Sequence, residues 1–142
     1  MTEPVPVEVV SHYASLPSPG LADTLDKKTS VDVVGYGVQE QIVGGGPPAW
    51  TGPLVRLQAQ AHPVSGNFVH SDEFLRLTQN PGGGRGGTCF GDSGGPDLLG
   101  GTGTVLSVNS YVTNRNCSGV GYGSRVDIPE VLEWIEKVTG LT

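Results

Sequence analysis

Short runs of β-branched residues, separated by glycines and prolines, are the feature that most constrains how this chain folds. The sequence has 23 glycines and 11 prolines among its 142 residues. Glycine and proline mark turns and interrupt helices, whereas β-branched residues favour strands. Valine-rich runs at 31–34 and 105–108 lie among such breaks. We therefore predict an all-β sandwich or barrel and not a helical protein.

The length allows one core of ordinary size, so we expect a single compact unit. Apolar patterns predict strands over 31–34, 54–59, 67–70, 105–112 and 120–126. Residues 1–30 carry four prolines and lack a core pattern, which predicts an extended connector on the surface.

The end of the chain has helical spacing. Asp127 precedes the apolar residues as a candidate N-cap, Glu130 follows three residues later as in a capping box, and Gly140 stands where a left-handed C-cap is expected. The apolar positions of this predicted 127–140 helix are Ile128, Val131, Leu132, Ile135 and Val138.

Charge and composition exclude several classes of partner. A net charge of −6 repels phosphate, so neither nucleic acid nor an anionic membrane is expected to bind. The first residues do not have the pattern of a secretion signal. The stretch from His70 to Glu73 is better read as a solvated turn than as a metal site, and we expect no cofactor. The two cysteines leave one bridge or two free thiols open.

The chemically informative stretch is Thr88-Cys-Phe-Gly-Asp-Ser-Gly-Gly-Pro96. A serine among glycines can expose its hydroxyl on a tight turn while nearby backbone N–H groups hold a developing oxyanion. A polar surface loop is the simpler interpretation of a bare Gly-x-Ser-x-Gly match. The α/β-hydrolase elbow does not fit, because its histidine follows the serine in the chain. Here His12, His62 and His70 all precede Ser93.

The segment Gly91-Asp-Ser-Gly-Gly-Pro96 resembles the nucleophile motif of the trypsin- and chymotrypsin-like serine proteases. Further similarity lies in the spacing of Cys89 and Cys117, in the Val33–Gly37 segment, in the Gly121–Val126 segment and in the terminal helix with Trp134. The resemblance implies a six-stranded Greek-key antiparallel barrel over 31–126, followed by a C-terminal α-helix.

Residue by residue, the resemblance implies that Ser93 is the nucleophile and that the backbone N–H groups of Gly91 and Ser93 form the oxyanion hole. It implies that Asp92 pairs with the freed amino terminus of an activated protease, and that Cys89 and Cys117 form a disulfide. By the same resemblance, the chain is expected to come from a secreted, extracellular protein.

The resemblance also implies a substrate-binding pocket. Gly87 stands where trypsin-like members place an aspartate, so a basic substrate side chain would find no partner there. Val112 should narrow the entrance, which favours small or medium apolar side chains. Tyr111 and Val112 can also be read as ordinary strand residues that pack the barrel. The expected substrate-binding residues are Gly87, Thr88, Ser110, Tyr111, Val112 and Gly121.

No segment resembles the family's Ala-Ala-His-Cys setting of the catalytic histidine. The resemblance therefore covers only the C-terminal half of a serine endopeptidase, whose partners would be a peptide substrate and the missing N-terminal barrel. We expect this chain to be inactive alone. Two other hypotheses remain: a non-catalytic barrel that acts as a binding module, and a self-sufficient hydrolase that uses His62 or His70 as its base.

Overall fold

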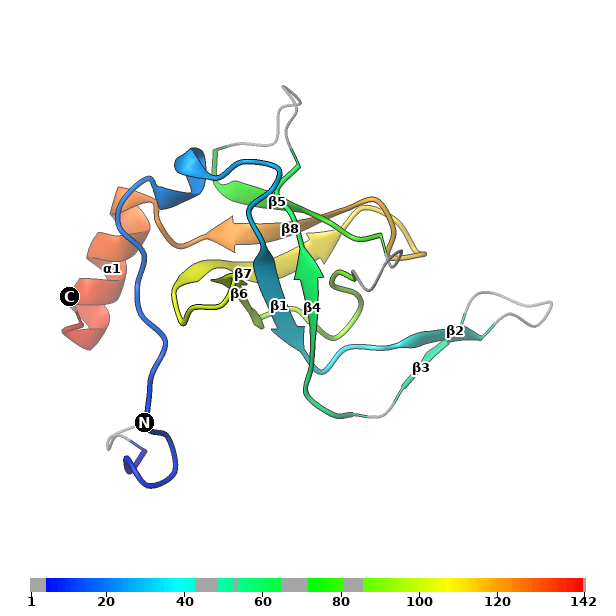
Figure 1. Cartoon of the computed structure of the whole chain (residues 1–142), viewed down its shortest axis with the longest axis horizontal. Helices are drawn as coiled ribbons and strands as arrows, with labels where there is room; N and C mark the ends of the chain where they lie inside the picture. Colours follow the sequence, from blue (N-terminus) through cyan, green and yellow to red (C-terminus); the bar gives the residue numbers. More distant parts are fainter. Residues whose placement is uncertain (1–4, 43–48, 53, 65–71, 81–85, 142) are drawn as a thin grey trace.

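Eight strands and one α-helix make up the computed structural model, which describes residues 5–42, 49–52, 54–64, 72–80 and 86–141 (Figure 1). Six of the strands form one antiparallel sheet in the order β4-β1-β6-β7-β8-β5. Their bounds are β1 Val31–Gly35, β4 Leu57–Ala61, β5 Phe74–Thr78, β6 Pro96–Leu99, β7 Val105–Val112 and β8 Val120–Arg125. Strands β2 (Glu40–Ile42) and β3 (Ala49–Thr51) pair separately as a hairpin that projects from this sheet.

The sheet curls until its two outer strands meet. Pro63, just after β4, forms a bridge with Leu77 of β5. The N–H of Val64 donates to the carbonyl oxygen of Arg76, and that of Thr78 donates to the carbonyl oxygen of His62, both over 2.9 Å. The predicted fold class, an antiparallel β-barrel followed by a C-terminal helix, is confirmed.

The apolar core fills one part of the barrel. It contains buried side chains from β1, β4, β5 and β7, because alternate residues of each strand point inward. The buried cluster consists of Ala22, Val31, Val33, Ala61, Leu75, Leu77 and Leu106. Another part of the interior is polar, with buried side chains of Gln79, Thr88, Asp97, Ser107 and Asn109.

The segment before β1 is more than a surface connector. A short 3-10 helix, η1 (Leu21–Thr24), inserts Ala22 into the core, and Leu21 and Leu25 pack against it. The N–H of Ala22 donates to the buried Asp127 carboxylate over 2.7 Å. The sequence analysis did not predict the packing of η1, since the few apolar residues of this proline-rich segment show no regular strand or helix spacing.

Arg125 and Asp127 anchor η1 to the end of β8. The Arg125 guanidinium donates Nε–H and Nη2–H to the two Asp127 oxygens over 2.9 Å each, and Nη1–H to Asp23 over 2.8 Å. Hydrogen bonds that Arg125 donates to Asp127 raise the pKa of the guanidinium. Burial opposes ionisation of Asp127, but the bonds from Arg125 and Ala22 outweigh it and lower the pKa of this carboxyl.

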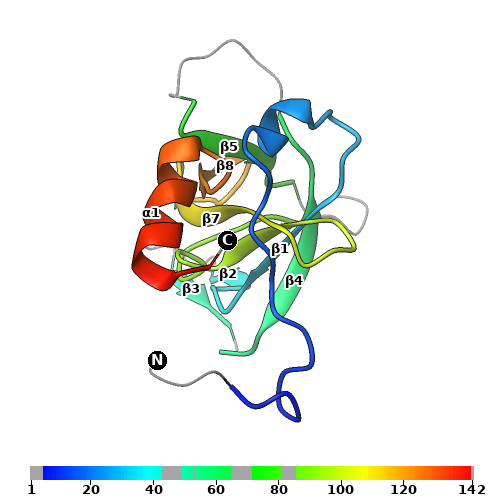
Figure 2. The same ribbon diagram turned by 90° about the vertical axis from the view of Figure 1, so that its left-hand side faces the viewer.

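Helix α1 (Pro129–Thr139) differs from its sequence prediction at one end. Ile128, not Asp127, is the N-cap, and no side chain caps the helix, because the Asp127 carboxylate is already bound to Arg125 and Ala22. The capping-box prediction was therefore wrong. Gly140 is the C-cap with φ +72°, as predicted. Figures 1 and 2 both place α1 at the side of the barrel.

Two strands of the six-stranded sheet escaped sequence analysis. Neither β5 nor β6 was predicted, because both lack a run of β-branched residues and each contains a charged residue, Arg76 in β5 and Asp97 in β6. The strand predicted over 67–70 lies outside the described residues. Within the described ranges, no helix has both the length and the apolar character that crossing a membrane requires.

Candidate active site

Ser93 lies on an exposed turn between the loop after β5 and strand β6. The turn is fixed by backbone hydrogen bonds: Gly94 N–H donates to Asn109 O over 2.9 Å, and Asn109 N–H donates to Gly95 O over 2.8 Å. Gly91 has φ +95°, which is strained for residues with a side chain. The glycines around Ser93 therefore permit a turn that presents its hydroxyl to solvent.

Asp92 faces away from the solvent side of this turn and occupies a notch in the Gly35–Gly37 segment. Its Oδ1 accepts from the N–H of Gly37 and its Oδ2 from the N–H of Cys89, both over 2.8 Å. A Cβ at Gly35 or Gly37 would lie 1.9 or 2.5 Å from the Asp92 carboxylate. The Gly-x-Gly spacing therefore makes room for a carboxylate that holds the turn from Gly91 to Pro96 against the end of β1. We name this segment the nucleophile turn after the predicted role of Ser93.

The amino terminus expected to pair with Asp92 has no counterpart among the described residues, which begin at residue 5. The two backbone N–H groups are the partners that the structure shows for this carboxylate. The expected ion pair stays a prediction.

The backbone N–H groups of Gly91 and Ser93 make no hydrogen bond to any described residue. Two such free donors on one turn are what an oxyanion requires. The Ser93 hydroxyl donates to the carbonyl oxygen of Ser110 over 3.2 Å. Because a carbonyl oxygen held in a strand cannot remove a proton, this contact orients the hydroxyl without activating it.

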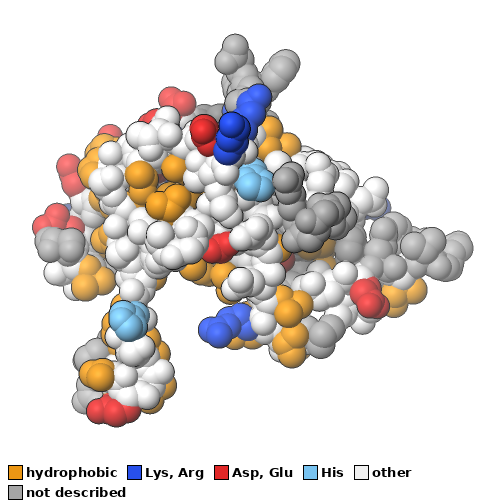
Figure 3. Space-filling view, viewed as in Figure 1, with side chains coloured by type: hydrophobic (Ala, Val, Ile, Leu, Met, Phe, Trp, Pro, Cys, Tyr) orange, Lys and Arg blue, Asp and Glu red, His pale blue; other side chains and the backbone are white. Residues whose placement is uncertain are grey.

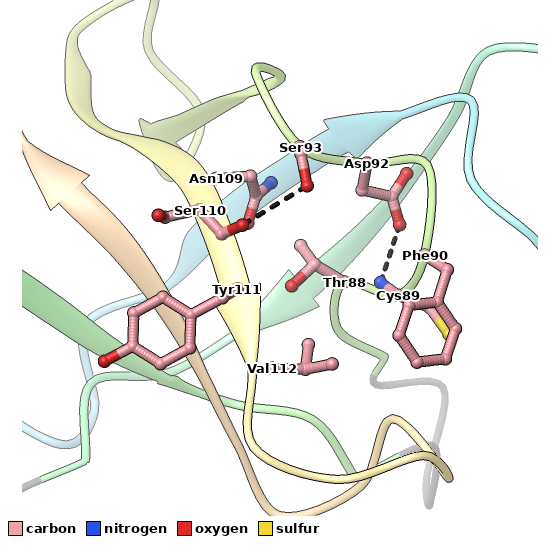
Figure 4. Close-up of a pocket in the computed structure, with 9 residues that line it drawn as sticks. All are labelled: Thr88, Cys89, Phe90, Asp92, Ser93, Asn109, Ser110, Tyr111 and Val112. Atoms are coloured by element: carbon pink, nitrogen blue, oxygen red, sulfur yellow. Dashed lines mark hydrogen bonds between the residues drawn. The ribbon is translucent and has the colours of Figure 1, made fainter.

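A pocket opens beside Ser93, between the nucleophile turn and strand β7 (Figure 4). Four of the expected substrate-binding residues line it with Ser93: Thr88, Ser110, Tyr111 and Val112. The rest of its lining is Cys89, Phe90, Asp92 and Asn109. Thus the structure brings together most of the residues that the motif implied.

Gly87 and Gly121 do not line this pocket. The Gln79 side chain fills the space between them, since a Cβ at Gly87 would lie 2.6 Å from Gln79 Cα and one at Gly121 would lie 2.9 Å from Gln79 Nε2. Gln79 is 2% exposed, and its Nε2 donates to the Thr88 carbonyl oxygen. The two glycines therefore flank a glutamine beneath the pocket instead of forming its open walls.

The predicted disulfide is confirmed. Cys89 and Cys117 are bonded, with their Cα atoms 5.2 Å apart. The bridge joins the start of the nucleophile turn to the loop between β7 and β8. It therefore ties Cys89, which lines the pocket, to the loop that follows Val112, another lining residue.

The described histidines do not approach Ser93. His62 Nδ1 binds the carbonyl oxygen of Thr29 over 2.9 Å, and His12 Nδ1 binds the Ser11 hydroxyl over 3.0 Å. Neither lines the pocket. His70, the other candidate base, lies outside the described residues. In the described part of the chain, no group of histidine, cysteine and acidic side chains is arranged to hold a metal ion.

Sequence reasoning missed Gln79, Asp97 and Asn109, which lie behind the pocket wall or in it. Asp97 is fully buried, and its Oδ2 accepts from the Ser107 hydroxyl over 2.6 Å. Burial raises the pKa of Asp97 to about 7. One signal for Asp97 was available in the sequence. This acidic residue directly follows the Gly94-Gly-Pro96 turn, at a position where the inner face of a strand should be apolar.

Comparison with known proteins identifies solved structures that share the fold of this chain. No family model matches the chain, and neither does any curated protein. Solved structures do match. HL collagenase aligns with a TM-score of 0.65 at 19% identity, over 91% of this chain and 54% of that one. A mutant of human heparin binding protein aligns with a TM-score of 0.64 at 20% identity, over 89% of this chain and 49% of that one.

An inactivated protease paralogue from the scabies mite aligns with a TM-score of 0.62 at 20% identity, over 89% of this chain and 52% of its own. This chain thus spans about half the length of the structures that it matches. At these identities the likeness concerns the fold alone. The chain has the fold of one half of a chymotrypsin-like serine protease.

Proposed function

We propose that this chain is the nucleophile-bearing half of a serine endopeptidase, with Ser93 as the attacking residue. The observation that carries the proposal is the pairing of an exposed Ser93 hydroxyl with two unbonded backbone N–H groups beside an open pocket. Acyl transfer needs this combination, because the hydroxyl forms the new bond while the N–H groups hold the oxyanion.

The proposed reaction has two stages. As Ser93 Oγ bonds to the substrate carbonyl carbon, a general base takes its proton, and the carbonyl oxygen becomes an oxyanion held by the N–H groups of Gly91 and Ser93. The amine leaves with that proton, and water then releases the acyl group from Ser93. Asp92 would keep the turn in shape through its bonds to Gly37 and Cys89.

The general base would come from a first barrel, which we propose as the partner of this chain. Coverage of about half of each matched structure supports such a partner. Apolar side chains on the surface support it too. Trp134 and Val138 of α1 are each 62% exposed, and Leu54 is 87% exposed near β4. Figure 3 shows hydrophobic side chains in several groups on one face of the molecule.

A disulfide persists in oxidising compartments, so we propose that the protein works outside the cell or in a similar environment. Peptides are the proposed substrates.

The test is peptide hydrolysis by the chain joined to the proposed first barrel. A fluorogenic peptide library should be cleaved by the joined protein, and Ser93→Ala should lower turnover by about 10⁶-fold. The exposed Ser11→Ala is the matched control and should leave turnover unchanged. Cleavage that survives Ser93→Ala would contradict the proposal.

A non-catalytic binding module is the second candidate. Two observations favour it: the Ser93 hydroxyl donates to Ser110, and no described histidine lines the pocket. One matched structure is itself called an inactivated protease paralogue. If the joined protein binds peptides but cleaves none of them, this second function replaces the first.

A further inference from the structure

Asp97 is a buried acidic residue that the proposed reaction does not use. It lies in β6, directly after the nucleophile turn, and its side chain is fully buried. Three strands surround it. Val33 of β1 and Ser107 of β7 are its partners in the sheet, and a Cβ at Gly123 of β8 would lie 2.3 Å from its Oδ2. None of these three neighbours carries a charge.

The hydrogen bonds of Asp97 suit a neutral carboxyl group better than a charged one. Its Oδ2 accepts from the Ser107 hydroxyl over 2.6 Å, whereas its Oδ1 has no hydrogen-bond partner in the described structure. A carboxylate is an acceptor at both oxygens, and burying it with few donors is costly. One hydroxyl is therefore a poor exchange for the water that an ionised Asp97 would lose.

The charged groups of the neighbouring elements do not offset a charge on Asp97. On β1, Asp32 accepts from a backbone N–H of the loop between β6 and β7, and β7 has no charged side chain. On β8, Arg125 is already paired with two other carboxylates, and the tyrosines of β7 and β8 stack on each other. Burial, with a contribution from the negative charge of Asp92 and against the bond from Ser107, raises the pKa of Asp97 to about 7.

The ladder between β6 and β7 joins Asp97 to the nucleophile turn. Asp97 pairs with Ser107, and two residues further along this ladder Asn109 meets the turn itself. The N–H of Asn109 donates to the carbonyl oxygen of Gly95 over 2.8 Å, and its carbonyl oxygen accepts from the N–H of Gly94 over 2.9 Å. Separation of the turn and the start of β6 from β7 would break these bonds and expose the Asp97 carboxyl group to water.

We infer that Asp97 is a positioning residue for Ser93: its neutral carboxyl group, held by Ser107, keeps the nucleophile turn closed on β7, and its ionisation favours opening of the turn. An ionised Asp97 gains hydrogen bonds from water in the open state, whereas a neutral one needs fewer partners in the closed state. The inference deepens the proposed function by naming what keeps the turn in order, and it rests on that function for the role of Ser93. The opening itself is measurable whether or not the chain is part of an enzyme.

Amide hydrogen exchange in the 142-residue chain tests this inference without catalysis. The N–H groups of Gly94 and Asn109 are followed by NMR from pH 5 to pH 8, and each rate is corrected for the exchange rate of an unstructured peptide. The opening constant of both groups should rise by at least about tenfold over this range, because opening releases a proton from Asp97. The rise should level off once Asp97 is ionised in the closed state as well. Both groups should exchange faster than the amides between β1 and β4, since the opening is local.

Asp97→Asn keeps the size of the side chain and stays neutral, so the corrected exchange of Gly94 and Asn109 should no longer depend on pH. Ser107→Ala removes the bond that favours the ionised carboxyl, so it should move the levelling-off to higher pH, and it serves alone if Asp97→Asn does not fold. Asp32→Asn on the neighbouring strand is the matched control and should keep the pH dependence of the wild type.

Two results overturn the inference. One is corrected exchange of Gly94 and Asn109 that does not change with pH in the wild type, or that changes equally in Asp97→Asn. The other is exchange of these groups only at the rate of the amides between β1 and β4, because Asp97 would then support the whole fold and not the turn. Failure of the proposed function is seen separately, as peptide cleavage that survives Ser93→Ala.

Discussion

Asp92 shows how one side chain can hold the nucleophile turn in place. Its two oxygens accept from the N–H groups of Gly37 and Cys89, which lie on different segments. The Gly35–Gly37 notch leaves space for a carboxylate and for little else. The charge of Asp92 therefore strengthens two backbone hydrogen bonds, whether or not an amino terminus pairs with it.

We predict that Asp92→Asn destabilises the fold by about 1–3 kcal/mol, because an amide NH₂ must then face a backbone N–H and one charge-assisted bond is lost. Urea unfolding followed by circular dichroism measures the change. The control is Asp72→Asn on the exposed surface, which should shift stability by less than about 0.5 kcal/mol. Equal stability of the two variants would contradict the role that we assign to Asp92.

Asp97 predicts a dependence of stability on pH. Burial raises its pKa from 3.8 to about 7, while the bond from Ser107 opposes this shift and the nearby charge of Asp92 adds to it. The folded state therefore binds a proton that the unfolded state has lost between these two values. Stability from this group is complete below pH 4 and falls as the pH rises through 7, by roughly 4 kcal/mol in all.

Asp97→Asn removes this titration. The difference in free energy of unfolding between the wild-type chain and this variant should change with pH between 4 and 8, in favour of the wild type at the acidic end. Urea unfolding at several pH values measures it. A difference that stays constant over this range would show that Asp97 titrates normally.

At the scale of elements, the disulfide links the nucleophile turn to the loop between β7 and β8. The bridge spans 28 residues. Closing a loop of that length should stabilise the chain by roughly 3.6 kcal/mol through the entropy of the unfolded state. Replacing Cys89 and Cys117 together by alanine should therefore lower stability by about that amount. Thermal unfolding measures this, and a variant as stable as the oxidised wild type would contradict it.

Local sequence patterns predicted an element well where neighbouring residues alone determine its structure. Strand β1 and strand β7 were predicted from their β-branched runs, and the Gly140 cap from its position after a helical pattern. Local patterns failed where residues that are distant in the sequence bind the same side chain. The capping role of Asp127 was lost to Arg125 and Ala22, which only the folded chain brings near. Strand β6 was missed because Asp97 is buried by tertiary packing.

At the scale of the whole molecule, the short motif from Gly91 to Pro96 indicated more about the fold than the amino-acid composition could. The barrel, the helix and the disulfide were predicted from the motif's resemblance and are present. The pocket was predicted only in part. Its position beside Ser93 follows from the motif. Asn109 enters its lining from β7, and Gln79 lies beneath it just after β5, and the sequence does not encode either placement locally.

The central claim is that Ser93 is a nucleophile whose base lies outside this chain. A fluorophosphonate probe that bonds to activated serines tests it most directly, with the labelled residue located by mass spectrometry. The isolated chain should be labelled slowly or not at all, because its hydroxyl donates to Ser110 and is not deprotonated. Joining the proposed first barrel should make labelling rapid, and Ser93→Ala should abolish it. Rapid labelling of the isolated chain, lost in Ser93→Ala and in either His62→Ala or His70→Ala, would contradict the claim and establish a self-sufficient enzyme.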